Sequence, residues 1–139
     1  MSEEKIVSKV EKSNIGEVTV KNFMHSPVIT VMPSYSIKTT IDTFKNHKIS
    51  STPVVDEDGT LLGIISEFDL LIQASTKDLH DQISFTKNVY KVTSKTTLKE
   101  VLIVLFKNKL KHIPVVNDKN YVVGTVSRIN VLAYLSEHN

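Results

Sequence analysis

The segment Gly63-Ile64-Ile65-Ser66-Glu67-Phe68-Asp69 reads as a short apolar strand that ends at a serine and passes directly into a helix. The first N–H groups of a helix have no partner inside it, so such a junction favours an anion. The Ser66 hydroxyl adds a donor, and the Asp69 carboxylate, about one turn into the helix, can accept two neighbouring hydroxyls. An anion next to a diol is the chemistry of a ribose phosphate, and the junction predicts a site for one.

A helix cap is the alternative interpretation of the same residues. Ser66 is a favoured residue at the start of a helix, and an acid such as Asp69 in the first turn complements the helix dipole. Together they stabilise a helix by about 1 kcal/mol without any ligand. One junction by itself leaves both interpretations open.

The junction returns later in the chain as Gly124-Thr125-Val126-Ser127-Arg128-Ile129-Asn130, at an offset of 61 residues (124 − 63 = 61). The same offset pairs Pro53 with Pro114 and needs no gap across the repeat. Two copies are too few for a solenoid, so a closed pair is expected. In the second copy, Thr97 and Glu100 also have the spacing of a capping box.

Each copy predicts the order strand, helix, strand, strand, helix. The expected elements of the first copy are a strand at 28–31, a helix after the N-cap Ser36, a hairpin that opens at Pro53 and returns over 61–65, and a helix whose apolar face is Phe68, Leu71 and Ile72. The predicted organisation is an N-terminal arm or short helix at 1–17, a first repeat at 18–74, a connector at 75–82 and a second repeat at 83–139.

Composition restricts the function classes. The 139 residues suffice for one domain or two halves that share a core, with 40% hydrophobic and 23% charged residues as in an ordinary soluble protein. A net charge of +2 without a basic block argues against nucleic acid. Cysteine is absent and the five histidines lack ligand spacing, so no metal site is predicted. Without an apolar span or a signal-peptide pattern, no membrane association is expected and the cytoplasm is the default location.

The ordered pair of motifs resembles the CBS domain pair, also called a Bateman module. The resemblance rests on Ser51-Thr52-Pro53-Val54-Val55-Asp56, on the Gly63 junction and on their partners around Pro114 and Gly124, and it covers about 20–137. It implies an α+β fold of two β-α-β-β-α repeats packed about a pseudo-twofold axis. It also implies homodimers and adenosyl ligands (AMP, ADP, ATP or S-adenosylmethionine) bound in two clefts between the repeats.

By that resemblance, each cleft takes its serine and acid from one repeat and its base-facing wall from the other. The first cleft would contain Ser66, Asp69, Val89, Tyr90, Lys111, His112 and Ile113. The second would contain Met24, Val28, Ile29, Ser50, Ser51, Thr52, Ser127, Arg128 and Asn130.

The two clefts are expected to differ in ligand. Asn130 stands where the first junction has Asp69, and a neutral amide replaces a charged acceptor at a cost of roughly 1 kcal/mol. Glu67 would repel a triphosphate, whereas Arg128 would attract a phosphate. The first cleft therefore ranks above the second. Tyr90 is equally consistent with core packing and with stacking on a base.

No nucleophile with a base, metal or phosphate loop is recognisable, so an enzyme is not expected. We expect a stand-alone regulatory module that binds an adenosyl ligand and signals to an effector protein in trans. The alternative is a scaffold for dimerisation or partner docking whose clefts no longer bind nucleotide.

Overall fold

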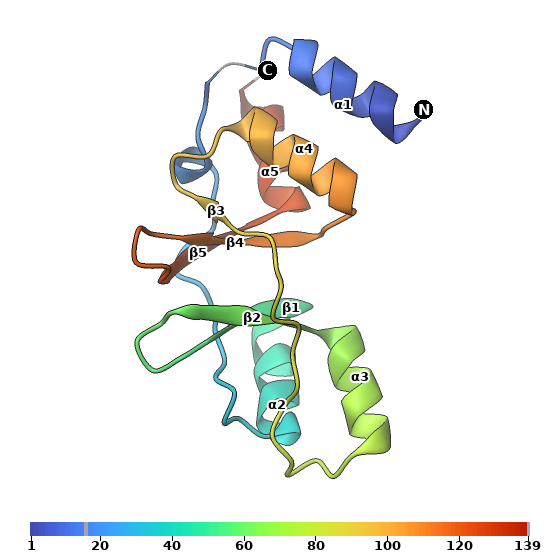
Figure 1. Cartoon of the computed structure of the whole chain (residues 1–139), viewed down its shortest axis with the longest axis vertical. Coiled ribbons are helices and arrows are strands. Elements are labelled where there is room, and N and C mark those ends of the chain that lie inside the picture. The colour runs from blue at the N-terminus through green and yellow to red at the C-terminus, as the bar shows by residue number, and fades with distance from the viewer. Residues whose placement is uncertain (16, 139) are drawn as a thin grey trace. The chain divides into compact units, whose positions relative to one another are not determined.

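The computed structural model describes residues 1–15 and 17–138, and the chain forms two compact α+β units (Figure 1). Unit 1 contains Met1–Pro27, Tyr90–Asp118 and Val123–Asn139, and unit 2 contains Val28–Val89 and Lys119–Val122. Gly16 and Asn139, which fall in the predicted N-terminal arm and at the end of the predicted second repeat, lie outside the described residues.

The units do not follow the predicted repeat boundaries. Residues 18–27, expected at the start of the first repeat, pack in unit 1, where Val20 and Phe23 join the core of the second repeat. Residues 83–89, expected to open the second repeat, pack in unit 2, where Ile83 and Phe85 join the core of the first. Each repeat's core therefore incorporates the segment that leads into the other repeat.

Unit 2 is built on an antiparallel hairpin with two helices. Helix α2 spans Ile37–His47, strand β1 Ser51–Val55, strand β2 Leu61–Ser66 and helix α3 Glu67–Thr76. The hairpin and both helices were predicted, and Ser51 pairs with Ser66 where β2 meets α3. The strand expected at 28–31 is wrong: only Val31 forms a bridge, parallel to Val54. The segment also contacts β1 through Thr52 Oγ1, which donates to Ile29 O, but this side-chain bond does not extend the backbone pairing.

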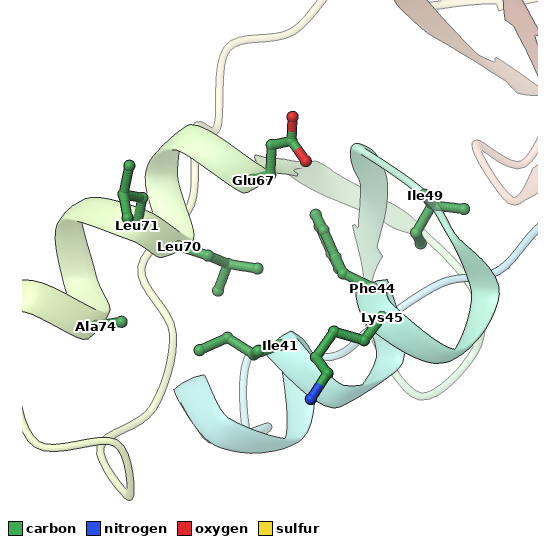
Figure 2. Close-up of a pocket in the computed structure, with 8 residues that line it drawn as sticks. All are labelled: Ile41, Phe44, Lys45, Ile49, Glu67, Leu70, Leu71 and Ala74. Carbon is green, nitrogen blue, oxygen red and sulfur yellow. The ribbon is translucent and has the colours of Figure 1, made fainter.

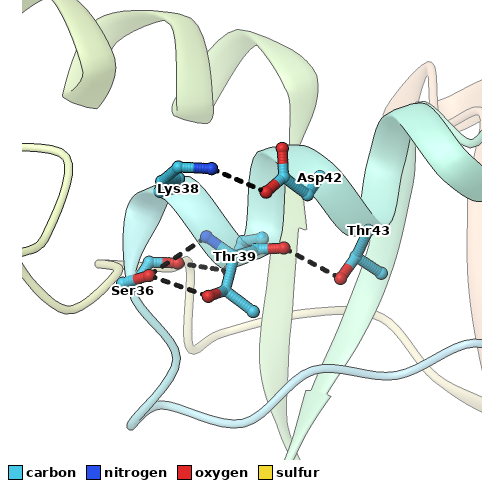
Figure 3. Close-up of polar contacts among 6 residues, drawn as sticks. Ser36, Lys38, Thr39, Asp42 and Thr43 are labelled. Carbon is cyan, nitrogen blue, oxygen red and sulfur yellow. Dashed lines mark hydrogen bonds and ion pairs between the residues drawn. The ribbon is translucent and has the colours of Figure 1, made fainter.

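Helix α2 has one buried and one polar face. The predicted N-cap is confirmed, because Ser36 Oγ accepts a hydrogen bond of 3.0 Å from Thr39 N–H. On the polar face, Lys38 Nζ lies 3.1 Å from Asp42 Oδ2 and Thr43 Oγ1 donates to Thr39 O (Figure 3). Both charged side chains are about half exposed, so the ion pair contributes at most about 1 kcal/mol.

Unit 1 has a three-stranded sheet in the order β3-β4-β5, with β3 (Val92–Thr93) parallel to β4 (His112–Val116) and β5 formed by Val122–Ser127. Its helices are α1 (Glu3–Lys12), α4 (Leu98–Asn108) and α5 (Arg128–Glu137), with a short 3₁₀ helix at Val20–Asn22. The predicted capping box is confirmed: Glu100 N–H donates to Thr97 Oγ1 at 3.2 Å and Thr97 N–H to Glu100 Oε2 at 3.0 Å.

Helix α1 packs on α4 (Figure 1). Val7 is buried, and Lys99 Nζ donates to the carbonyl oxygens of Glu11 and Ser13 at the end of α1, at 2.9 and 3.1 Å. At the repeat offset, α4 has Ile103 and Val104 where α2 has the polar pair Asp42 and Thr43. The outer face of α4 is apolar because α1 covers it.

The apolar face predicted for the helix after Ser66 is wrong. Phe68, Leu71 and Ile72 are exposed by 66%, 62% and 49%, and α3 instead buries Leu70 and Gln73. Gln73 holds the segment that follows the connector, since its amide donates to Ser84 O and accepts from Ser84 N–H, both at 2.8 Å. No helix among the described residues has the length and apolarity that a membrane span requires.

Candidate functional site

The strand-to-helix junction at Ser66 forms a reciprocal cap. Asp69 N–H donates to Ser66 Oγ at 3.2 Å, and Ser66 N–H donates to Asp69 Oδ2 at 2.9 Å. The helix-cap interpretation is therefore correct for this junction. The cap uses only one carboxylate oxygen: across residues 1–15 and 17–138, Asp69 Oδ1 accepts no hydrogen bond. Asp69 can hold its helix and still accept a ligand hydroxyl.

The expected set of unpaired backbone donors is largely absent from this junction. Glu67 N–H donates to Ser50 O at 2.9 Å, and Asp69 N–H donates to the serine. Of the first three N–H groups of α3, only that of Phe68 makes no hydrogen bond within the described part of the chain. The loop that leads into β1 satisfies the helix end, so side chains rather than backbone dipoles decide which ligand fits here.

The junction at Ser127 has the same cap, but the atoms that it leaves available to a ligand are different. Asn130 Oδ1 accepts from both Ser127 N–H, at 2.9 Å, and Ser127 Oγ, at 2.8 Å. Its oxygen is therefore occupied twice, and the amide NH₂ is the part of Asn130 left to face a ligand. The two junctions share a backbone geometry but offer an acceptor at Asp69 and a donor at Asn130.

Their surroundings also differ in charge. Arg128 Nε donates to Leu110 O at 2.8 Å, and Arg128 N–H donates to Lys111 O at 3.3 Å. Burial, with the nearby charges of Lys111 and Arg128, lowers the pKa of His112 from its ordinary value of 6.5. The Ser127 junction is thus surrounded by basic groups, whereas Glu67 and Asp69 give the Ser66 junction carboxylates.

The two units divide the polar and charged residues of the predicted site by repeat. Ser50, Ser51 and Thr52 lie in unit 2 with Ser66, and Thr52 Oγ1 also donates to Ile29 O. Lys111 and His112 lie in unit 1 with Ser127 and Arg128. The repeat offset makes Ser50 equivalent to Lys111, and this signal could have predicted the grouping. The assignment of walls across repeats involves both units and stays a prediction.

The remaining predicted residues differ in exposure. Tyr90 is 53% exposed, so the core interpretation of this side chain is wrong. Ile113 is wholly buried in the core of unit 1, which leaves its side chain no surface for a base. Met24, Val28, Ile29 and Val89 are partly buried, and Thr52 is buried. The sequence could not separate Ile113 from Tyr90, because both lie beside an apolar segment and spacing alone does not show which side chain the core covers.

The environment of His112 predicts a pH dependence of stability. Because its pKa is lower in the folded chain than the unfolded value of 6.5, the unfolded chain takes up a proton first as the pH falls. The contribution of neutral His112 to the free energy of unfolding is fully present above pH 6.5, and it is lost as the pH falls through the lowered pKa of the folded chain. Urea unfolding of the wild type and His112→Gln between about pH 7 and pH 5 should show a flatter pH profile for the variant. Parallel profiles would contradict the assignment.

The CBS-domain family model matches residues 20–75 and 80–137, two consecutive copies that cover most of the chain. The chain belongs to the CBS-domain family. Its two CBS repeats correspond to the sequence repeat, and the tandem CBS fold expected from the motifs is confirmed.

Two relatives match most of the chain at low sequence identity. An inosine-5'-monophosphate dehydrogenase from Methanocaldococcus jannaschii is 31% identical over 127 residues, which are 91% of this chain and 24% of that protein. The chain thus spans about a quarter of that enzyme's length. An uncharacterized 17.7 kDa protein from Acidianus ambivalens is 28% identical over 78% of this chain and 67% of its own length.

Two solved structures carry ligands. The CBS domain pair of protein MJ0100, in complex with 5'-methylthioadenosine and S-adenosyl-L-methionine, is 26% identical with a TM-score of 0.77 and covers 89% of this chain and 100% of its own. CBSX2 in complex with AMP is also 26% identical with a TM-score of 0.77, over 86% of this chain and 96% of its own.

Proposed function

We propose that the chain is a non-catalytic regulatory module that binds adenosyl ligands at the Ser66 and Ser127 junctions. The observation that supports it best is the spare Asp69 oxygen beside a serine hydroxyl at the start of α3. A carboxylate oxygen without a donor is a fitting acceptor for a ribose hydroxyl. CBS pairs of similar structure are known with AMP, S-adenosylmethionine or methylthioadenosine bound, which supports an adenosyl ligand here.

At the Ser66 junction, the charge pattern favours a ligand without a negatively charged phosphate chain. Asp69 would accept the ribose hydroxyls, and Ser66 would donate its hydroxyl proton to the 5' substituent. Glu67 is exposed one residue on and would repel a di- or triphosphate. Methylthioadenosine, with an uncharged tail, and S-adenosylmethionine, with a sulfonium, avoid that repulsion.

At the Ser127 junction, the same reasoning favours phosphate. Lys111, Arg128 and partly buried His112 supply positive charge or donors, and the Asn130 amide would donate to a ribose oxygen. The lowered pKa of His112 leaves this imidazole neutral near pH 7, and an approaching phosphate would favour its protonated form. We therefore assign AMP, ADP or ATP to this junction.

The adenine base requires an apolar surface. The partly exposed side chains predicted for this role, Met24, Val28, Ile29, Val89 and Tyr90, are retained as base-contacting candidates, with Ser51 and Thr52 as polar neighbours. Tyr90 is the candidate best suited to stacking because half of its side chain is exposed. Ligand binding would favour one conformation of the pair, which an effector protein in trans or a second copy of the chain would recognise.

A scaffold function is the second candidate. The exposed apolar residues on α3 and α5 are the observation that favours it, because such patches mark interaction surfaces. In that case the serine junctions would serve only as helix caps.

A thermal-shift panel separates the two functions. At a hundredfold excess over its dissociation constant, a ligand stabilises the folded chain by about 2.7 kcal/mol, or about 8 °C for a chain of this size. We expect a shift of that order with at least one of AMP, ADP, ATP, S-adenosylmethionine and methylthioadenosine. Uridine monophosphate, which has the ribose phosphate without adenine, serves as the control. If no adenosyl compound shifts the midpoint at millimolar concentration, the scaffold function stands instead.

A further inference from the structure

Helix α1 lies outside the residues that the CBS-domain family model matches, which begin at residue 20. The helix is amphipathic: six of its ten residues are charged, and Ile6, Val7 and Val10 form its apolar stripe. Val7 is buried where α1 packs on α4, and Ile6 and Val10 are partly buried. A helix of ten residues is marginal in isolation, so α1 depends on its contact with α4.

Helix α2, the counterpart of α4 in the other repeat, has a single apolar face. Its Ile41 and Phe44 point toward Leu70 of α3 across a groove of about 330 Å³ (Figure 2). Its polar face carries the ion pair between Lys38 Nζ and Asp42 Oδ2, at 3.1 Å. The charges of this ion pair are therefore satisfied within α2 itself.

Helix α4 has a second apolar face at the same place. At the repeat offset, Lys99 and Ile103 stand where α2 has its ion pair. With no acid at the fourth position along, Lys99 Nζ instead donates to the carbonyl oxygens of Glu11 and Ser13, at 2.9 and 3.1 Å. Carbonyl oxygens at a helix end lack partners in the helix and form the negative end of its dipole, so they favour a cation. This face of α4 therefore suits the C-terminal end of an amphipathic helix.

The chain that follows α1 is fixed to unit 1 by separate contacts. Leu98 N–H donates to Val18 O and Val20 N–H donates to Thr96 O, both at 2.8 Å. The Val20 side chain is wholly buried in the core of unit 1. These contacts hold the chain from Val18 onward, so α1 can leave α4 without breaking them.

We propose that this face of α4 is a docking surface for an amphipathic helix of the effector protein, and that α1 is a displaceable cover over it. The partner helix would carry branched apolar side chains in the spacing of Ile6, Val7 and Val10, and its C-terminal carbonyl oxygens would bind Lys99. The proposal rests on the regulation in trans included in the proposed function, and it specifies the surface that the effector contacts. Because α1 is tethered to the surface, a partner must compete with a high local concentration of α1.

Hydrogen exchange of the wild-type chain tests whether α1 opens by itself. We expect the amides of Val7 and Val10 in α1 to exchange at least a hundredfold faster than those of the buried residues Leu102 and Leu105 in α4. The reason is that local opening costs less free energy than global unfolding. Equal protection of the two helices would show that α1 opens only when unit 1 unfolds, and would overturn the proposal.

A fluorescent peptide with the sequence of residues 1–15 tests docking in trans, by anisotropy on the full-length chain. Val7→Asp places a charge in the buried stripe of the tethered α1, so the peptide should bind this variant at least tenfold more tightly than the wild type. Val10→Asp, at a partly buried position, should act in the same direction. Lys5→Glu, at an exposed position of α1, is the matched control and should bind the peptide as the wild type does.

Adding Lys99→Met to Val7→Asp should weaken peptide binding at least threefold, because the carbonyl oxygens at the end of the peptide lose their donor. Equal affinity for the wild type and both aspartate variants, or an affinity that Lys99→Met leaves unchanged, would overturn the proposal. A wild-type oligomer that dissociates on Val7→Asp in light scattering would show that the surface binds α1 of a second copy, and would overturn it too. No nucleotide is used, so these outcomes are independent of whether the junctions bind ligand.

Discussion

Replacing Asp69 by asparagine is expected to weaken adenosyl-ligand binding at the Ser66 junction about fivefold, since a charged acceptor becomes neutral. The fold should survive, because asparagine already makes the same cap in this chain: Asn130 Oδ1 accepts from Ser127 N–H at 2.9 Å. Isothermal titration with S-adenosylmethionine and methylthioadenosine measures the loss, and urea unfolding checks that the stability changes by less than about 1 kcal/mol.

Asn130→Asp is the matched control for this substitution. It converts the second junction to the first and adds an acceptor beside Arg128, so it should leave binding at the Ser66 junction unchanged and weaken phosphate-bearing ligands at the Ser127 junction. If Asp69→Asn binds as tightly as the wild type while Asn130→Asp changes the affinity for methylthioadenosine, the ranking of the two junctions is reversed.

Replacing Gly63 by alanine is expected to destabilise the chain by about 3 kcal/mol, at the upper end for added volume in a packed site. A Cβ at this position would overlap the backbone oxygen of Thr86 and lie 2.7 Å from the Phe85 ring. The backbone at Thr86 cannot retreat easily, because Thr86 N–H donates to Ile64 O and Ile64 N–H donates to Thr86 O, at 3.0 and 2.9 Å.

Gly124→Ala is the comparison for that effect. Its Cβ would meet His25 O at 2.8 Å and the flexible Met24 side chain at 3.1 Å, so a loss of about 1 to 2 kcal/mol is expected. The urea midpoints of the two variants give the order directly. Equal losses, or a larger loss for Gly124→Ala, would contradict the close crossing of β2 by residues 85–86.

Local signals predicted much of this fold. Three features depend on residues only a few positions apart: the N-cap Ser36, the capping box at Thr97 and Glu100, and the β1–β2 hairpin. The local sequence is therefore enough to predict them. The repeat offset then linked these pieces into two copies, and the CBS resemblance that they predicted is confirmed.

Features that depend on distant contacts were not predictable in the same way. Spacing placed Phe68 and Leu71 on a buried face because it gives the period of a stripe but not the side that the core covers. Nothing local indicates that Val20 packs in unit 1 or Ile83 in unit 2, since each joins a core formed by the other repeat.

The candidate site was predicted in its residue types and only partly in its arrangement. The serine and the acid or amide at each junction follow from the motif, but the Ser50 carbonyl that occupies Glu67 N–H is a contact that the motif does not contain. The difference between Asp69 and Asn130 was visible in the sequence. The geometry sharpened it into one free carboxylate oxygen against one doubly occupied amide oxygen.

A residue-resolved ligand titration tests the central claim most directly. In ¹H–¹⁵N spectra of the isotope-labelled chain, methylthioadenosine should shift the amide signals of Ser66, Phe68 and Asp69, and AMP should shift those of Ser127, Ile129 and Asn130. Adenosyl ligands that leave both sets of amides unchanged at millimolar concentration would contradict the assignment of these junctions as the binding sites.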